Sequence, residues 1–174
     1  MDFYVILLRI IHFFAGVFWA GGTFLFVGAI APAVRLAGPD GAKFMQHLGR
    51  QGRMALSLSV AAVLSAASGL LLYWRTSGHL NGAWITSGPG LALTIGGASG
   101  LIAAVYGGVF VRATSARMGQ LARQIHASGG PPSPEQQAEA QQLGAKLGTG
   151  ALWTAGLLVV ALLGMATSQY LFAF

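Results

Sequence analysis

The sequence has no cysteine among its 174 residues. This absence excludes disulfide bonds, thiolate metal sites, iron–sulfur clusters and the Cys-x-x-Cys-His attachment of a c-type haem. Any bound metal would have to be held by histidine, methionine, carboxylate or a prosthetic group.

Charged residues are also scarce. They make up 8% of the chain, whereas a soluble domain has about 25%, and the mean hydropathy is +0.66. Four apolar segments, at about 5–31, 54–74, 89–111 and 148–172, each reach the roughly 20 residues that cross a bilayer. We therefore predict an all-α integral membrane four-helix bundle that forms a single domain over residues 1–174.

Acidic side chains are missing from all four apolar segments. Their absence argues against a proton-coupled transporter or a carboxylate-lined ion pathway. The sequence also has no His-Glu-x-x-His motif, no phosphate-binding loop and no nucleophile–base–acid set. It therefore gives no support for a classical hydrolase or a nucleotide-dependent enzyme.

The formal net charge of +6 comes from basic residues beside the apolar segments. Because these residues form no patch on a separate domain, we expect no nucleic-acid partner. By the positive-inside rule, the two loops that hold most of them are cytoplasmic, so both termini and the 75–88 loop lie outside. The basic residues of these two loops are Arg35, Lys43, Arg50, Arg53, Arg112, Arg117, Arg123 and Lys146.

The third and fourth segments are predicted to continue as helices into the cytoplasm. No breaker occurs in residues 112–127, and the glycines and prolines of 129–132 end that run. Ser133 followed by Pro134 and Gln136 is a capping-box pattern that begins the next helix. We expect a helical hairpin with arms of about 15 residues, or roughly 20 Å.

Two ionisable residues, Arg9 and His12, lie inside the first apolar segment. Such groups are costly in a bilayer unless they face protein, water or a cofactor. Trp19 lies two helical turns after His12, so both side chains are expected to face the bundle. His12 is therefore a candidate metal ligand, as an axial ligand of haem b, and Arg9 a candidate partner for a haem propionate.

The alternative interpretation of this pair is structural. Arg9 then extends to the membrane surface, and His12 hydrogen-bonds to a carbonyl or threonine of a neighbouring helix.

A second haem ligand would have to lie at about the same depth in the bilayer as His12. Met165 and Gln169 in the fourth segment lie at a similar distance from the outer face, and histidine and methionine can ligate haem together. His47 is separated from His12 by most of the bilayer, so a bis-histidine haem is not expected. The predicted cofactor-binding set is His12, Arg9, Trp19, Met165 and Gln169.

The remaining histidines lie outside the apolar segments. His47, Arg50 and Arg53 recur every three residues, which clusters them loosely on one side of a helix as an anion or lipid contact, with lipid contact favoured. His79 lacks the methionines and acids of a copper site, and His126 is interpreted as a solvated helix end.

Small residues repeat every four positions in the third segment, at Gly96, Gly100, Ala104 and Gly108. Such a stripe lets another helix backbone approach closely. An alternative function follows from it: a non-enzymatic structural or accessory subunit that packs through small-residue faces in a homo-oligomer or a larger membrane complex.

The opening Arg9-Ile-Ile-His12, with Gly16, Trp19, Gly21-Gly22 and Pro32, resembles the copper-resistance-D-like group of small bacterial membrane proteins. It is more distantly similar to the J-type protoporphyrinogen oxidase, a four-helix, haem-associated membrane protein. The resemblance implies an inward-facing His12, haem binding, and a multi-pass protein of the bacterial inner membrane, with copper handling as a further alternative. The lysine of the oxidase's third helix and the Asn-Glu motif of its last helix have no counterpart here, so porphyrinogen oxidation is not implied.

Overall fold

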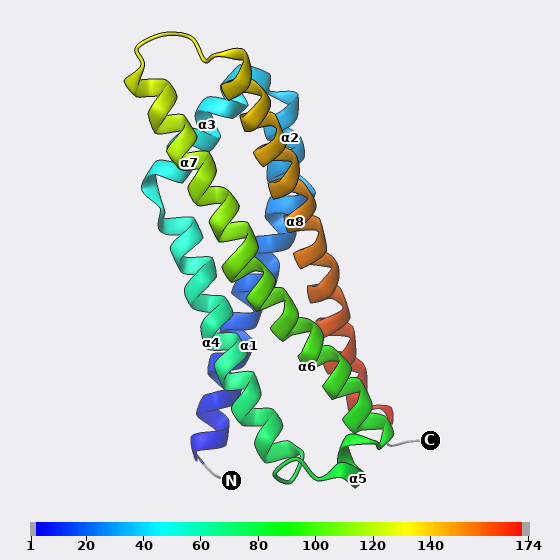
Figure 1. Ribbon diagram of the computed structural model, residues 1–174. Helices are drawn as coiled ribbons and strands as arrows, with labels where there is room; N and C mark the ends of the chain where they lie inside the picture. Colours follow the sequence, from blue (N-terminus) through cyan, green and yellow to red (C-terminus); the bar gives the residue numbers. More distant parts are fainter. Residues whose placement is uncertain (1–2, 172–174) are drawn as a thin grey trace.

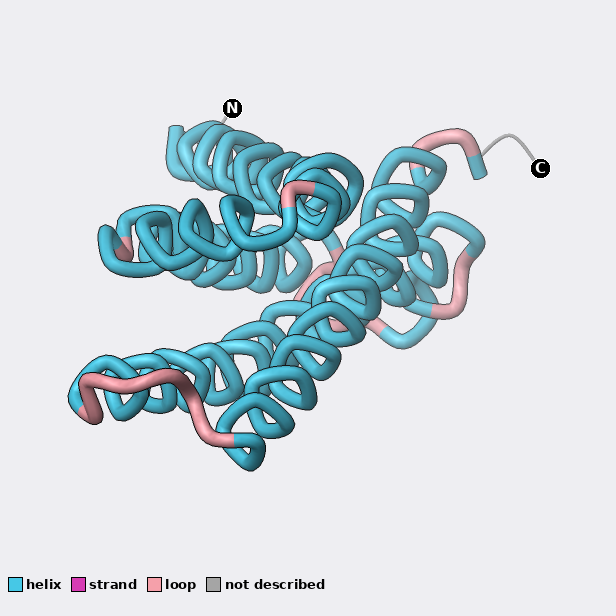
Figure 2. The backbone as a smooth tube through the Cα atoms, turned by 90° about the horizontal axis from the view of Figure 1, so that it is seen from above, coloured by secondary structure: helices cyan, strands magenta, loops and turns pink. Residues whose placement is uncertain are grey.

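The computed structural model describes residues 3–171, apart from the side chains of residues 50 and 51. This part of the chain is helical and contains no strand, and its loops are short connections (Figure 2). Four of its continuous helices are long and apolar enough to cross a membrane. The predicted all-α fold is therefore confirmed. These helices span Phe3–Leu36, Arg53–Thr76, Gly88–Ala127 and Pro134–Ser168.

The first long helix consists of α1 (Phe3–Leu25), a π-helical turn η1 (Phe26–Ile30) and α2 (Ala31–Leu36). The first apolar segment was expected to end at about residue 31, but the helix continues to Leu36, so that expected end was wrong. Pro32 lacks the N–H that an α-helix would use at this position, and the wider turn just before it lets the helix continue.

The other elements follow in chain order. The third long helix also contains a π-helical turn, η2, between α6 and α7. The bounds are α3 (Gly38–Gln51), α4 (Arg53–Thr76), α5 (Gly82–Ile85), α6 (Gly88–Tyr106), η2 (Gly107–Val111), α7 (Arg112–Ala127) and α8 (Pro134–Ser168).

The long helices associate as two pairs, α1 with α4 and α6 with α8. The pairs lie close together near the middle of the bundle, and α1 and α8 lie apart at the end that holds α5 (Figure 1). We call this end the α5 end and the opposite end, where α3 lies, the α3 end.

A small core joins the two pairs at mid-bundle. Trp19 and Ala20 of α1 pack in one buried cluster with Ala61 of α4, Ala103 of α6 and Leu158 of α8. Most large apolar side chains instead point outward, including those of Phe3, Phe14, Val63, Val105 and Leu163. This distribution is the one expected when lipid rather than water surrounds the helices.

The predicted hairpin beyond the third and fourth segments is present. Ser133 and Gln136 form the expected capping box at the start of α8. Leu121 of α7 and Leu143 of α8 are buried, and Arg117 Nε donates to Glu139 Oε1 at 2.7 Å. The helical structure of these arms is therefore confirmed, while their position in the cytoplasm stays a prediction.

Candidate functional site

His12 lies on the side of α1 that faces the bundle. Leu8, one turn before it, and Trp19, two turns after it, are both buried, and His12 itself is half-buried. The periodicity that predicted an inward-facing His12 is thus matched by the burial of its neighbours on the same face.

The ring of His12 is held by the backbone of α4. Its Nδ1 lies 2.8 Å from the carbonyl oxygen of Ser65. A carbonyl oxygen can only accept, so Nδ1 must carry the hydrogen. The Ser68 hydroxyl, 3.5 Å from Nδ1, donates to the carbonyl of Leu64. The interhelical hydrogen bond of the structural interpretation is therefore confirmed.

This hydrogen bond determines whether Nε2, the other ring nitrogen, can act as a ligand. In the neutral ring the hydrogen is on Nδ1, so Nε2 keeps its lone pair. Among the residues that the structure describes, Nε2 has no hydrogen-bond partner. Metal-bound histidines almost always have this arrangement, with the non-ligating N–H given to a carbonyl, a carboxylate or water.

Two glycines let the ring approach α4. A Cβ atom at Gly69 would lie 2.8 Å from His12 Cε1 and 3.1 Å from Nδ1. A Cβ atom at Gly16, one turn from His12, would lie 3.3 Å from the Ser65 hydroxyl oxygen. The sequence interpretation missed Ser65 and Ser68. The sequence feature that could have indicated them is the presence of two small polar residues just before Gly69 in an apolar segment.

Arg9 is exposed, and it makes no hydrogen bond or ion pair with any described residue. It is one helical turn from His12, on the side of the α5 end. This exposure matches the interpretation in which Arg9 extends away from the bundle, and it leaves the guanidinium available to an anion.

Met165 lies at the same level as His12 but belongs to the other helix pair. Trp19 and Leu158 share the core cluster, and His12 and Met165 are each seven residues from them toward the α5 end. His12 contacts α4, whereas the backbone of Met165 packs against Gly96 of α6. The predicted depth match therefore holds along the chain, and the two residues contact different helices.

Gln169 is exposed at the C-terminal cap of α8. The structure gives it no contact with His12 among the described hydrogen bonds. Of the predicted cofactor set, Trp19 and His12 thus share one face of α1, and Met165 and Gln169 lie on α8.

His47 and Arg53 do not share a helix face. The helix that holds His47 ends at Gln51, Gly52 takes a left-handed φ of 62°, and Arg53 is the first residue of α4. The prediction of one helical cluster was therefore wrong, because the glycine breaks the helix between them. His47 donates from Nδ1 to the Lys43 carbonyl at 2.9 Å, and the side chain of Arg50 lies outside the described part.

The two other histidines lie apart from this site. The ring of His79 packs edge-on against Trp74 with centroids 5.4 Å apart, and His126 is exposed near the end of α7. Within residues 3–171, no group of three or more histidines, aspartates and glutamates is placed to hold a metal ion.

The small-residue stripe of α6 faces α8 of the same chain. A Cβ atom at Gly96 would lie 3.0 Å from the Ala161 carbonyl oxygen and 3.2 Å from the Cα of Gly164. At Gly100 it would lie 3.6 Å from the Cβ of Ala161, and at Gly108 it would meet open space. The tightest part of the stripe is thus occupied by α8 of the same chain, whereas Gly108, which lies in η2, is left open.

No family model matches this chain, and no curated protein or solved structure is significantly similar to it. The resemblance of the first helix to the copper-resistance-D-like group therefore stays a prediction.

Proposed function

We propose that this chain is a haem-binding or redox-associated protein of the bacterial inner membrane, with His12 Nε2 as an axial ligand of haem b. One observation supports this most directly. The Nδ1–H of His12 is bound to the Ser65 carbonyl, which fixes the ring and leaves the lone pair of Nε2 for a metal. The proposed topology places both termini and α5 outside and the hairpin of α7 and α8 in the cytoplasm.

The residues around His12 fit this ligand in chemical type. The site has an imidazole with a defined tautomer, apolar neighbours such as Leu8, and an exposed guanidinium at Arg9, one turn away. Met165, at the same level on the opposite pair, is the proposed second ligand. Bound haem would supply one-electron redox chemistry, while the protein would hold the ring, pair with a propionate and exclude water.

A non-enzymatic accessory subunit is the second hypothesis. The observation that favours it is the same hydrogen bond, because pairing with a carbonyl already satisfies one polar atom of His12 inside the bundle. Copper handling is not carried into the proposal, because no three or more histidines, aspartates and glutamates of the described residues are placed together to hold a metal ion.

The test is the optical spectrum of detergent-purified protein from haem-supplemented cells, oxidised and then reduced with dithionite. The proposal predicts a Soret band with b-type α and β bands after reduction. His12→Gly should lose them, and imidazole added to that variant should restore them, because a free ring replaces the missing ligand. His126→Gly, which removes an exposed histidine, should retain them.

A colourless wild-type protein purified in good yield from such cells would overturn the proposal. If that colourless protein also co-purified with a defined partner, the accessory-subunit hypothesis would be supported. Met165→Leu should leave haem bound but shift the reduced bands and the midpoint potential, because methionine ligation raises the potential of a haem.

A further inference from the structure

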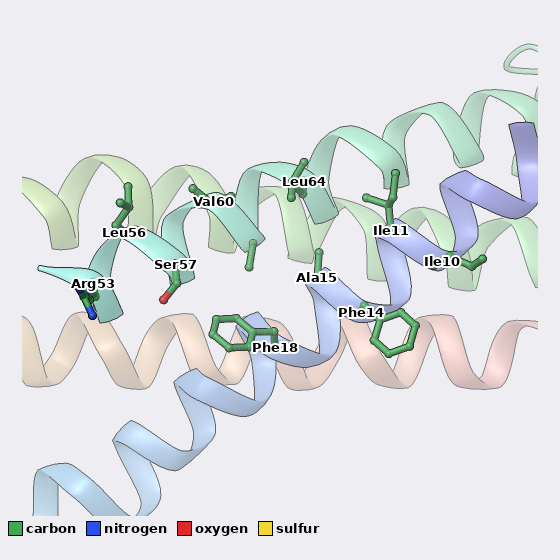
Figure 3. Close-up of a pocket in the computed structure, with 11 residues that line it drawn as sticks. Ile10, Ile11, Phe14, Ala15, Phe18, Arg53, Leu56, Ser57, Val60 and Leu64 are labelled. Atoms are coloured by element: carbon green, nitrogen blue, oxygen red, sulfur yellow. The ribbon is translucent and has the colours of Figure 1, made fainter.

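A groove of the molecule lies between α1 and α4. Its volume is about 620 Å³, and its walls are almost wholly apolar. Ile10, Phe14 and Phe18 line it from α1, and Val60 and Leu64 line it from α4 (Figure 3).

The groove follows the two helix axes. Its α1 residues recur at intervals of four, and its α4 residues lie on one helical face that begins at Arg53 and continues through Ser57 and Val60 to Leu64. At 1.5 Å per residue, this face is about 17 Å long. The groove therefore has the elongated shape and apolar lining that suit an acyl chain.

One end of the groove carries a positive charge. Arg53 and Ser57 lie together at one end of the groove (Figure 3), which is the α3 end because α4 begins there at Arg53. Arg53 is exposed and makes no ion pair or hydrogen bond with any described residue. Ser57 donates to the carbonyl of Met54 at 3.1 Å, so its oxygen can still accept.

We infer that this groove is a binding site for an anionic phospholipid. One acyl chain lies between Phe14 and Leu64, and the headgroup phosphate contacts the Arg53 guanidinium. The position of Arg53 supports this assignment, because it begins α4 where the apolar segment starts, at the depth where a headgroup meets the hydrocarbon. A guanidinium matches a phosphate in both charge and geometry. The inference extends the lipid contact that the sequence suggested, and it does not depend on haem.

The helix break at Gly52 makes this arrangement possible. Had α3 continued through residue 53, Arg53 would have belonged to the helix of His47 and not to α4. The left-handed turn instead starts a new helix at Arg53 and aligns it with Ser57 and Val60. A basic residue of the connecting loop thereby becomes the end of an apolar groove.

The experiment is native mass spectrometry of delipidated, haem-free protein, titrated with phosphatidylglycerol or phosphatidylcholine of identical chains. We expect one phosphatidylglycerol to bind about fivefold more tightly than phosphatidylcholine, since one basic residue contributes about that factor. Arg53→Gln should abolish the preference. Lys43→Gln, which removes an exposed charge that is paired with Asp40 on α3, should retain it.

The groove itself is tested by filling it. Val60→Trp should weaken the binding of both lipids at this site, whereas Val63→Trp, at an exposed position of the same helix outside the groove, should leave it unchanged. An unchanged lipid preference in Arg53→Gln would overturn the inference. A second pair of results would also overturn it. If inorganic phosphate displaced the lipid from the wild-type protein and Val60→Trp bound the lipid normally, the site would be one for a free anion.

Discussion

The two helix pairs use glycine in opposite ways. Between α6 and α8, Gly96 and Gly164 bring two backbones together, and a Cβ atom at Gly164 would lie 2.6 Å from the carbonyl oxygen of Ala92. Between α1 and α4, three glycines make room for side chains: Gly69 for His12, Gly22 for Leu58 and Gly16 for Ser65.

This difference separates a pair that packs backbone against backbone from a pair that accommodates side chains. Backbone contact leaves little that can move, since main-chain atoms cannot rotate away from a new methyl group. A glycine opposite a side chain instead creates a place where a polar ring can bind inside an apolar bundle. The α1 and α4 pair holds His12, and the α6 and α8 pair is expected to supply the more rigid half of the molecule.

The largest effect is expected at the backbone contact. Gly164→Ala should destabilise the protein by about 2 kcal/mol, because its methyl group would overlap the backbone of α6. The measurement is the free energy of unfolding in mixed detergent micelles. Gly156→Ala on the same helix, where a Cβ atom meets nothing within 4 Å, is the control. Equal stability of the two variants would contradict the proposed close contact.

A smaller loss is expected where glycine faces the histidine. Gly69→Ala should cost about 1 kcal/mol, because the His12 ring must shift by some tenths of an ångström. In the His12→Ala background the same change should cost nothing, since the ring is gone. Gly21→Ala, which meets open space on α1, controls for the added methyl group. Additive effects of the two substitutions in the unfolding free energy would refute the contact.

The smallest effect is expected where the pairs are joined near the α5 end. The hydroxyl oxygens of Tyr73 on α4 and Thr94 on α6 lie 2.6 Å apart. Tyr73→Phe should cost about 0.6 kcal/mol, the average for such bonds between membrane helices. Tyr170→Phe, which removes an exposed hydroxyl, should cost less. A double-mutant cycle with Thr94→Val should give a coupling of the same size, and zero coupling would show that the bond is not formed.

The features that local rules govern could be predicted from the sequence. The length and apolarity of the segments gave four long helices, and the Ser133 and Gln136 pattern gave the start of α8. The inward orientation of His12 followed from its spacing to Trp19. Each of these depends on residues within a few turns of one another.

The features that depend on a distant partner could not be predicted in this way. A stripe of small residues looks the same whether it packs on another subunit or, as Gly96 does, on α8 of its own chain. The sequence did not show that a helix ends at Gly52 or that the first helix continues past Pro32. A single glycine or proline within such a run is compatible both with the end of a helix and with its continuation. Depth alone could not show that His12 and Met165 belong to different pairs.

The acceptor for His12 is a main-chain oxygen, and this has a consequence for how the site would change over evolutionary time. Any residue that keeps α4 helical at position 65 presents the same carbonyl, so substitution there cannot delete the hydrogen bond. Selection to keep the ring in place would act on position 69, where a side chain collides with it. Distant relatives that retain this site should therefore be recognised by a histidine and a glycine at positions 12 and 69, while residue 65 varies freely among small side chains.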